Sequence, residues 1–216
     1  MISVGKIPST QSYAHDMIAQ GNAMHNTVVV ADAQSAGRGR FRRTWISHHG
    51  NLYASFIYTC DERDARLAYS VAIAVAETLI AFGLLPSIKW PNDILIESKK
   101  IAGILIEYYS RFVVVGIGIN IANSPMLQKY ETTKMSDFVN VSREDVLAKL
   151  MKNMTKWINT DFSVVRARWM DLAIGLNKTI KYKGTPAELI GINENGALVL
   201  RRESKYFLVY GDEIVI

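Results

Sequence analysis

Residues 37–45, with the sequence Gly-Arg-Gly-Arg-Phe-Arg-Arg-Thr-Trp, limit most strongly how this chain can fold. The stretch cannot form a core strand or a stable helix, because the glycines expose the backbone and the four arginines repel one another. It therefore predicts a loop. Such a loop suits phosphate, toward which backbone N–H groups and guanidinium forks can converge. Solvated surface charge or an RGG-like nucleic-acid segment remain alternatives.

The composition is that of an ordinary folded chain. Its 216 residues are 49% hydrophobic and 21% charged, which predicts one good-sized domain with a real core and a small appendage. No apolar run reaches the roughly 18 residues that a membrane helix needs, and the N-terminus lacks a signal-peptide core. Cys60 is the single cysteine, so we expect no disulfide framework and a cytoplasmic location.

The net charge of +5 favours anionic partners, namely nucleotides, nucleic acids or acidic proteins, without choosing among them. His48 and His49 lack a third ligand at metal spacing, so we assign them to a loop surface. The motifs GxxxxGK[ST], HExxH and GxSxG do not occur, which leaves nucleophilic and zinc hydrolase chemistry unsupported.

Helices and strands alternate through most of the chain. Ser9 is placed as a helix N-cap, Gly83 as a helix stop, and Ser142 with Asp145 at capping-box spacing. We expect only a short tail before Ser9. The predicted helices cover 9–21, 64–82, 142–159 and 162–172, and the predicted strands cover 27–32, 51–59, 87–90, 94–96, 101–109 and 112–121.

From Lys178 onward the pattern changes to short strands, predicted at 179–183, 187–192, 197–202, 206–210 and 213–216. Asn195-Gly196 marks a hairpin turn among them. We therefore predict an α+β domain with a mixed or antiparallel sheet at 1–174, followed by a small SH3-like β-barrel at 175–216.

A second cluster, Lys89-Trp-Pro-Asn-Asp93, reads as a turn because proline fixes φ and Asn and Asp cap their own backbone. A lysine and an aspartate held at opposite ends of a rigid turn can position a phosphate ligand and its metal. The plainer interpretation is a hairpin turn with an exposed lysine.

Lys100 begins an apolar strand that contains Gly103, and a later strand carries Gly116 and Gly118. A glycine inside a strand weakens it and usually means that something approaches the backbone closely. Because GxG here has no third glycine and lies within a strand, it predicts the floor of a pocket rather than a dinucleotide fingerprint. The plainer interpretation of Lys100 is a rim lysine.

Taken together, these clusters resemble the biotin–protein ligase family. They occur in the family's order over residues 9 to about 120, and the β tail is similar to the family's C-terminal domain. The matching stretches are Ser9-Thr10-Gln11, Gln34-Ser-Ala-Gly-Arg-Gly-Arg40, Trp45, Gly50-Asn-Leu-Tyr53, Lys89-Trp-Pro-Asn-Asp93, Lys100-Ile-Ala-Gly-Ile-Leu-Ile-Glu107 and Gly116-Ile-Gly-Ile-Asn120.

The resemblance implies a class II synthetase-like catalytic fold and an ATP-dependent ligase. The family joins biotin to ATP as biotinyl-5′-AMP, with release of pyrophosphate, and passes biotin to one lysine of a biotin carboxyl carrier protein domain. It further implies Mg²⁺ carried with ATP, with Asp93 as a candidate neighbour and no certain metal ligand. Dimerisation through an exposed strand edge, which the family often uses, is left open.

The resemblance also assigns residues by position. For biotin it implies Ser9, Thr10 and Gln34 at the ureido ring with Gln11 beside them, Gly37, Arg38, Gly39 and Arg40 around the carboxylate, Lys100 at the reacting carboxyl, and Gly103, Gly116 and Gly118 leaving room for the ligand. For ATP and the adenylate it implies Arg38, Arg40, Arg43, Trp45, Lys89, Asn92, Asp93, Lys100 and Asn120. Of these, Lys100, Arg40 and Arg38 are the expected catalytic residues.

The chain departs from the family pattern at several points. Gln11 stands where Asn is usual, and Arg42 stands where the loop often has Gly. In the region Tyr130–Ser136 no clear aromatic residue is assigned to stack on adenine. The helix-turn-helix of the family's repressor members does not occur before Ser9, so we expect no DNA binding.

Two rival functions remain. A lipoate or octanoate ligase or transferase on the same fold would need a long apolar slot and no polar cluster for a ureido ring, and Gln34 with the 89–93 cluster argues against it. A basic RNA-binding protein would use the arginine loop and the β tail, with a steep salt dependence and no need for biotin.

Overall fold

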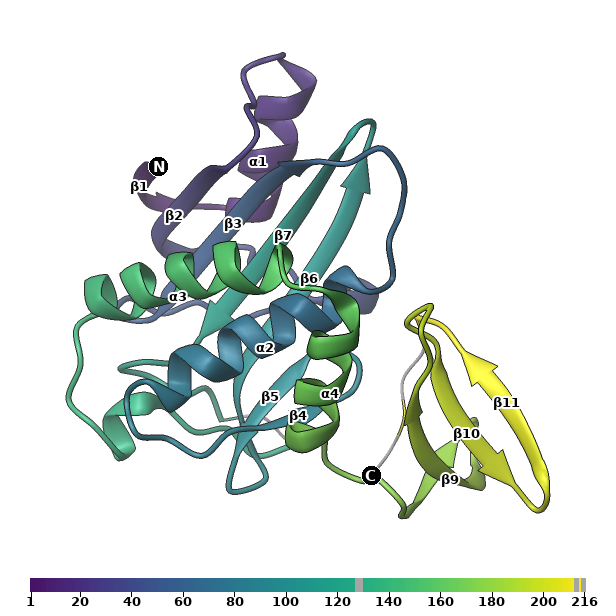
Figure 1. The fold of residues 1–216 in the computed structure, drawn as a ribbon. Helices are drawn as coiled ribbons and strands as arrows, with labels where there is room; N and C mark the ends of the chain where they lie inside the picture. The colour runs from purple at the N-terminus through teal and green to yellow at the C-terminus, as the bar shows by residue number, and fades with distance from the viewer. Residues whose placement is uncertain (127–129, 212–213, 215–216) are drawn as a thin grey trace. The chain divides into compact units, whose positions relative to one another are not determined.

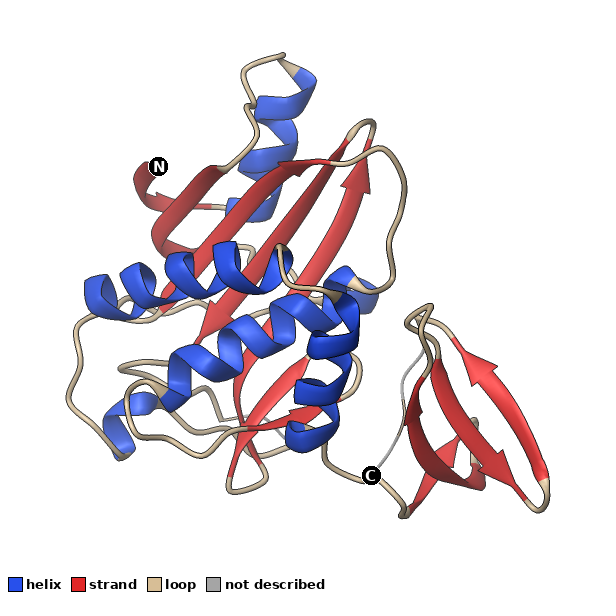
Figure 2. Ribbon diagram, in the orientation of Figure 1, coloured by secondary structure: helices blue, strands red, loops and turns tan. Residues whose placement is uncertain are grey.

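A computed structural model describes residues 1–126, 130–211 and 214 of the chain. The chain divides into two compact units, which are described separately. The first comprises residues 1–63 and 98–148, and the second comprises residues 64–97 and 149–216. Figure 1 labels the elements along the chain, and Figure 2 separates helices from strands by colour.

The first unit contains five neighbouring strands of a mixed sheet, in the order β1-β2-β3-β7-β6. β1 runs parallel to β2, while the other neighbouring pairs are antiparallel. The predicted mixed α+β architecture is therefore confirmed. The strands are β1 (Ile2–Ile7), β2 (Thr27–Gln34), β3 (Leu52–Thr59), β6 (Lys99–Tyr109) and β7 (Phe112–Ile119).

The expectation of a mere tail before Ser9 is wrong, because residues 2–7 form strand β1 at the edge of this sheet. Ile2 pairs with Val29 and Val4 with Ala31. The alternation of Ile2 and Val4 with exposed neighbours was a visible signal for a half-buried strand, although it spans few residues.

Helix α1 (Thr10–Ala19) packs against β2, β3 and β7. It begins where predicted, since the Ser9 hydroxyl accepts a hydrogen bond from the Ser12 N–H at 3.4 Å. Ala14 and Ile18 face the sheet and pack in one buried cluster with Val29 and Val114. This packing fixes the N-terminal turn of α1 above the sheet, where the polar residues of the candidate site begin.

The predicted arginine loop lies between β2 and β3 and contains a single short 3-10 turn, η1 (Arg40–Arg42). Phe41 and Arg42 both have positive φ, at 54° and 58°. Arg42 thus takes the left-handed conformation that glycine adopts without strain. A second 3-10 turn, η2 (Met135–Asp137), follows β7.

The second unit joins a helical layer to two groups of strands. Helix α2 (Leu67–Ile80) is buried on most of its faces and packs on α4 (Phe162–Leu172), with Arg168 Nε donating to Glu77 Oε1 at 2.7 Å. Strands β4 (Ser87–Lys89) and β5 (Asp93–Ile96) form an antiparallel hairpin. Helix α3 (Arg143–Ile158) begins in the first unit and continues in the second.

The C-terminal residues form a four-stranded antiparallel sheet with the order β11-β10-β9-β8. The small β unit is therefore confirmed, but no closed barrel occurs among the described residues, and most of the strand expected at 213–216 lies outside them. A separate domain boundary after residue 174 stays a prediction. The strands are β8 (Thr179–Tyr182), β9 (Thr185–Ile192), β10 (Leu198–Arg202) and β11 (Lys205–Val209).

The predicted hairpin turn between β9 and β10 is present, with Asn193 Oδ1 accepting from the N–H groups of Asn195 and Ala197 at 3.0 and 2.9 Å. Within the described ranges, the structure has no helix with the length and apolar character needed to cross a bilayer.

The ion pair between Asp32 on β2 and Arg143 at the start of α3 predicts a pH-dependent share of stability. Arg143 Nη1 lies 2.6 Å from Asp32 Oδ1, and this hydrogen bond lowers the pKa of Asp32. A carboxyl with a lowered folded-state pKa adds stability above its unfolded pKa of about 3.9, and loses it as pH falls through the folded value. Because the pair is partly exposed, Asp32→Asn should cost at most about 1 kcal/mol at neutral pH.

Thermal unfolding of the wild type and Asp32→Asn at neutral and at acidic pH checks this expectation. The difference in Tm should shrink as the pH falls below the Asp32 pKa. Asp16→Asn, at an exposed position on α1, provides the control and should change Tm little at either pH. A difference that persists in acid would show that the charge of Asp32 is not what stabilises the start of α3.

Candidate ligand-binding site

The candidate site is built on three glycines of neighbouring strands in the first unit. Gly103 on β6 lies opposite Gly118 on β7, and Gly116 lies two residues before Gly118. A Cβ at Gly118 would lie 2.5 Å from Trp45 Nε1, and a Cβ at Gly103 would lie 2.8 Å from Trp45 Cζ3. The indole of Trp45 therefore lies directly on the strand backbone, as close as only glycine permits.

A buried polar cluster lies at one end of this glycine floor. The Thr10 N–H donates to Gln34 Oε1 at 2.8 Å, and Gln34 Nε2 donates to Ser47 Oγ at 2.8 Å. Ser55 Oγ lies 2.9 Å from Thr10 Oγ1 and 3.0 Å from Gln11 Oε1. Helix α1, strands β2 and β3 and the arginine loop thus contribute to one hydrogen-bonded group, which brings together the predicted residues 9–11 and Gln34.

Gln11 occupies the position where the family usually has Asn, and its longer side chain is fully used. Its Nε2 donates to the Val114 carbonyl at 3.1 Å, and a Cβ at Gly116 would lie 2.6 Å from its Oε1. The carboxamide therefore lies over Gly116 in the same way that Trp45 lies over Gly118. In this structure the three glycines accommodate protein side chains, and their role toward a ligand stays a prediction.

The arginine loop is folded back on itself beside this floor. Trp45 N–H donates to the Gly37 carbonyl at 2.9 Å, and Gly39 N–H donates to the Arg43 carbonyl at 2.8 Å. A Cβ at Gly37 would lie 2.3 Å from the Trp45 carbonyl oxygen, so the narrow base of the loop requires glycine there. The loop places its arginines at the rim while it sends Trp45 inward.

The loop arginines have different contacts. The guanidinium groups of Arg40 and Arg43 lie over the Phe41 ring, 4.9 and 5.6 Å from its centroid. Arg38 forms an ion pair with Glu107 on β6. Three of the arginines predicted to bind anions therefore already have partners within the protein. Arg40 and Arg43 contact Phe41 within the loop, and Arg38 contacts Glu107 on β6.

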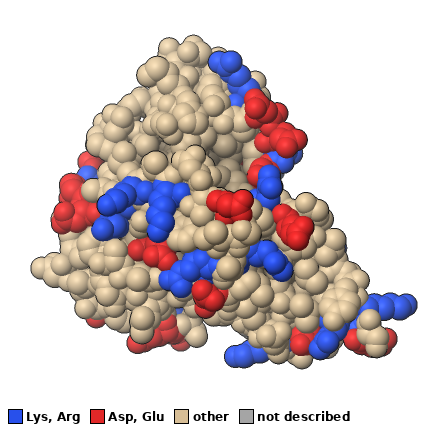
Figure 3. All heavy atoms as spheres, viewed as in Figure 1, with Lys and Arg blue, Asp and Glu red and all other residues tan. Residues whose placement is uncertain are grey.

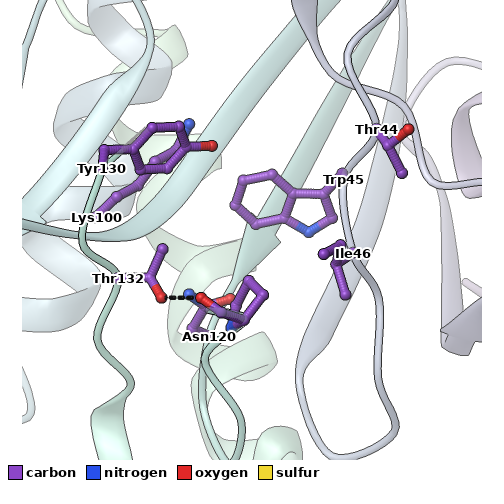
Figure 4. A pocket seen from close by; sticks show the side chains of 8 residues that line it. Thr44, Trp45, Ile46, Lys100, Asn120, Tyr130 and Thr132 are labelled. Carbon is purple, nitrogen blue, oxygen red and sulfur yellow. Dashed lines mark hydrogen bonds between the residues drawn. The ribbon is translucent and has the colours of Figure 1, made fainter. Parts of the chain in front are cut away.

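A small pocket opens at the other end of the floor, between the loop and the segment after β7 (Figure 4). Lys100 Nζ lies 5.3 Å from the ring centroids of both Trp45 and Tyr130. The cavity volume is about 20 Å³, enough for a water molecule but not for a nucleotide. A nucleotide can enter only if Trp45 or the neighbouring segment shifts.

Two buried polar atoms at this pocket have no hydrogen-bond partner among the described residues, namely Trp45 Nε1 and Asn120 Oδ1. The amide nitrogen of Asn120 donates to the Thr133 carbonyl at 3.1 Å, which fixes the direction of its oxygen. A buried polar atom without a partner costs about 1–3 kcal/mol, so a ligand that supplies one donor and one acceptor would recover that energy.

Tyr130 is a site residue that sequence reasoning missed. It lines the pocket beside Lys100, in the region where no residue was assigned to stack on adenine. Lys100 N–H donates to the Glu131 carbonyl at 2.9 Å, and Thr133 N–H donates to the Lys100 carbonyl at 3.0 Å. This pairing of two distant segments brings Tyr130 to the pocket, and no local sequence signal reports it.

The 89–93 cluster belongs to the second unit. Lys89 and Asp93 are direct cross-strand partners at the ends of the predicted turn. Trp90 is structural, since its Nε1 donates to Tyr69 Oη at 3.1 Å and Tyr69 Oη donates to the Gly196 carbonyl at 2.9 Å. Burial raises the pKa of Tyr69 to about 12, so it stays a donor at any physiological pH. The roles of Lys89, Asn92 and Asp93 toward ATP stay predictions.

The other titratable residues considered as candidates, His48, His49 and Cys60, form no further binding or metal site among the described residues. His48 and His49 are exposed, as expected, and burial raises the pKa of the Cys60 thiol. Across the described ranges, no three His, Cys, Asp or Glu side chains converge as a metal cage would require. Mg²⁺ held through nucleotide phosphates needs only one or two protein carboxylates.

Residues 4–122 match the model of the Biotin/lipoate A/B protein ligase family. The chain belongs to this family. It is 33% identical to the bifunctional ligase/repressor BirA of Bacillus spizizenii, over 96% of this chain and 71% of that protein. It is 31% identical to the biotin–[acetyl-CoA-carboxylase] ligase of Paracoccus denitrificans, over 80% of this chain and 83% of that protein.

Solved structures agree with this assignment. The biotin protein ligase of Aquifex aeolicus in complex with biotin and ATP superposes with a TM-score of 0.86 at 26% identity, covering 99% of this chain and 96% of that one. The biotin protein ligase of Leishmania major in complex with biotinyl-5-AMP gives a TM-score of 0.69 at 25% identity, covering 97% of this chain and 98% of that one. The predicted family and catalytic fold are confirmed.

Because Trp45 lies so close to Gly118, we expect that one methyl group added at position 118 lowers the stability of the fold. Gly118→Ala must displace the indole or bend the strand, at a cost of about 1–3 kcal/mol, or a fall in Tm of about 3–10 °C. Gly5→Ala, where a Cβ would meet nothing within 4 Å, is the matched control. Differential scanning calorimetry compares the two, and equal Tm values would show that the indole does not lie on Gly118 in solution.

Proposed function

We propose that this chain is an ATP-dependent biotin–protein ligase. In the first step the biotin carboxylate attacks the α-phosphorus of ATP, which forms the biotinyl-5′-AMP anhydride and releases pyrophosphate. In the second step the amine of a carrier-domain lysine attacks the acyl carbon, which forms an amide and releases AMP. Catalysis here requires positioning two anions side by side and neutralising their charge.

The polar cluster is the proposed seat of the biotin ureido ring. That ring offers two N–H donors and one carbonyl acceptor, and Thr10, Gln34 and Ser55 offer hydroxyl and amide groups of both kinds. Ser9, Thr10, Gln11 and Ser55 are all nearly fully buried, which keeps the hydrogen-bonding groups of the cluster away from bulk water. Trp45 lies on Gly118 in this structure, and the thiophane ring and valeryl chain are proposed to lie along the glycine floor once the indole shifts.

The arginine loop is proposed to receive the anions. Gly37 and Gly39 let its backbone fold tightly at the base of the loop, and Arg38, Arg40 and Arg43 supply bidentate donors for the carboxylate and the phosphates. Lys100 is proposed to act as a point charge at the reacting carboxyl and α-phosphate. Its position beside the loop tryptophan and at the start of the glycine strand supports this role.

The pocket around Asn120 is proposed to hold the adenine. The free Asn120 Oδ1 suits an exocyclic amine as donor, and Tyr130 offers an aromatic face beside it. Mg²⁺ is proposed to arrive with the phosphates and to neutralise them when bound, with Asp93 as a candidate ligand. A biotin carboxyl carrier protein domain is the proposed acceptor, the cytoplasm the proposed location, and a homodimer a proposed assembly.

The observation that carries this function is the buried hydrogen-bonded cluster at the end of the glycine floor. The side chains of this cluster bond to one another, and a ureido ring, with two donors and one acceptor, can take over those hydrogen bonds, whereas the apolar end of lipoate or octanoate can only displace them. On the face seen in Figure 3, Lys and Arg side chains lie interspersed with Asp and Glu side chains. An RNA-binding protein would instead bind without any need for biotin and with a steep salt dependence.

Pyrophosphate exchange tests the function and the substrate together. Labelled pyrophosphate should enter ATP in the presence of Mg²⁺ and biotin, and not with lipoate or octanoate in place of biotin. Exchange with lipoate or octanoate alone would make the ureido assignment wrong. A chain that exchanges with none of these acids, but binds RNA with a steep salt dependence, would contradict the ligase proposal.

Lys100→Ala should reduce the rate of this exchange by about 100-fold or more, because a charge aimed at the developing transition state is lost. The neighbouring Lys99→Ala is the control, since Lys99 faces Glu131 at 3.4 Å on the exposed side and should keep near wild-type exchange. Comparable losses in both variants, at equal Tm, would remove Lys100 from the reaction centre.

A further inference from the structure

Glu107 is the last residue of the Lys100–Glu107 motif, and the proposed reaction assigns it no role. Side chains alternate along a strand, so Gly103, Leu105 and Glu107 of β6 lie on one face of the sheet. Glu107 is paired across the sheet with Val114, just beyond Gly116 on β7. Its carboxylate therefore lies at the end of the same glycine-floored face that carries the candidate site.

Both carboxylate oxygens of Glu107 are engaged, each by a different element. Oε1 accepts from Arg38 Nη2 of the arginine loop, and Oε2 lies 3.1 Å from His15 Nε2 of α1. Arg38 Nη1 also donates to Ser12 Oγ of α1 at 3.3 Å. The sheet, the helix and the loop thus meet at one guanidinium group, and Glu107 is the charge that joins them.

This contact removes freedom that the loop arginine would otherwise have. The Arg38 side chain is 41% exposed, and an unrestrained arginine gives up about 2 kcal/mol of rotamer entropy when it is fixed. A guanidinium group that is already oriented loses less of that entropy when an anion binds. Because Arg38 is part of the loop, the same contact ties the loop to β6.

We propose that Glu107 is a positioning residue for the ligase reaction, which orients Arg38 and holds the arginine loop against β6 so that the acyl-adenylate is retained. The inference rests on the proposed function, since Arg38 is assigned there to the carboxylate and phosphate. In this role Glu107 acts through Arg38 and does not need to contact the substrate. Ser12 and His15 of α1 act in support, Ser12 by accepting from Arg38 and His15 by contacting the second oxygen of Glu107.

The test measures release of biotinyl-5′-AMP from the enzyme, together with kcat and KM for biotin in pyrophosphate exchange. Glu107→Gln keeps the shape and removes the charge. It should speed adenylate release and raise KM about two- to fivefold, with kcat changed less. In an Arg38→Ala background the same substitution should have no further effect, because the two residues act as one unit.

The Arg201–Glu188 pair of the C-terminal sheet provides a matched control. Its side chains are 40% and 28% exposed, against 41% and 27% for Arg38 and Glu107. Glu188→Gln should leave adenylate release unchanged, and Tm values of all variants report whether each one folds. If Glu107→Gln is too unstable, His15→Gln removes the partner of the second oxygen and should shift release in the same direction.

Each outcome decides the proposal. Slower release or a lower KM in Glu107→Gln would mean that Glu107 competes with the ligand for Arg38, which overturns it. Unchanged release, or equal effects with and without Arg38, would overturn it as well. A wild-type chain that forms no adenylate with biotin would instead refute the proposed function, which keeps the two failures distinct.

Discussion

The close approach of side chains to strand backbone is the constraint on which the rest of the site depends. Trp45 lies on Gly118 and Gly103, and Gln11 lies on Gly116, at distances that any Cβ would prevent. Because the floor is flat, the arginine loop can fold inward over the sheet while its charged side chains remain at the rim. Glycine inside strands usually weakens a sheet, and here this cost is offset by the packing of an indole and a carboxamide.

The two ends of the glycine floor differ in how well their polar groups are satisfied. One end is a closed hydrogen-bond network around Thr10 and Gln34, with its donors and acceptors already oriented. The other end contains Lys100 and the unsatisfied atoms of Trp45 and Asn120, beside a cavity too small for a nucleotide. A biotin ligase needs two ends of different character, because one must hold the neutral ring of biotin and the other the nucleotide. The carboxylate of biotin and the phosphates of ATP must then meet between these two ends. The loop that carries the arginines spans that middle region.

Much of this could be predicted from local sequence. The Ser9 cap, the arginine loop, the strand glycines and the 89–93 turn depend on the intrinsic conformational preferences of Gly, Pro, Ser and Asn, which act over a few residues. Strand β1 was missed because a six-residue edge strand with two exposed polar positions has a weak alternation. Tyr130 was missed because its place depends on pairing between Lys100 and Thr132, which only the fold creates. The Glu107–Arg38 contact likewise joins residues 69 positions apart.

A crystal structure of the chain with biotin bound would test the central claim most directly. The account predicts that the ureido ring lies within hydrogen-bond distance of Thr10, Gln34 and Ser55, that the valeryl carboxylate points toward the arginine loop, and that the floor glycines contact the ligand without a change in strand register. Biotin bound elsewhere, or bound with its ring against Tyr130 and its carboxylate in the polar cluster, would contradict the account.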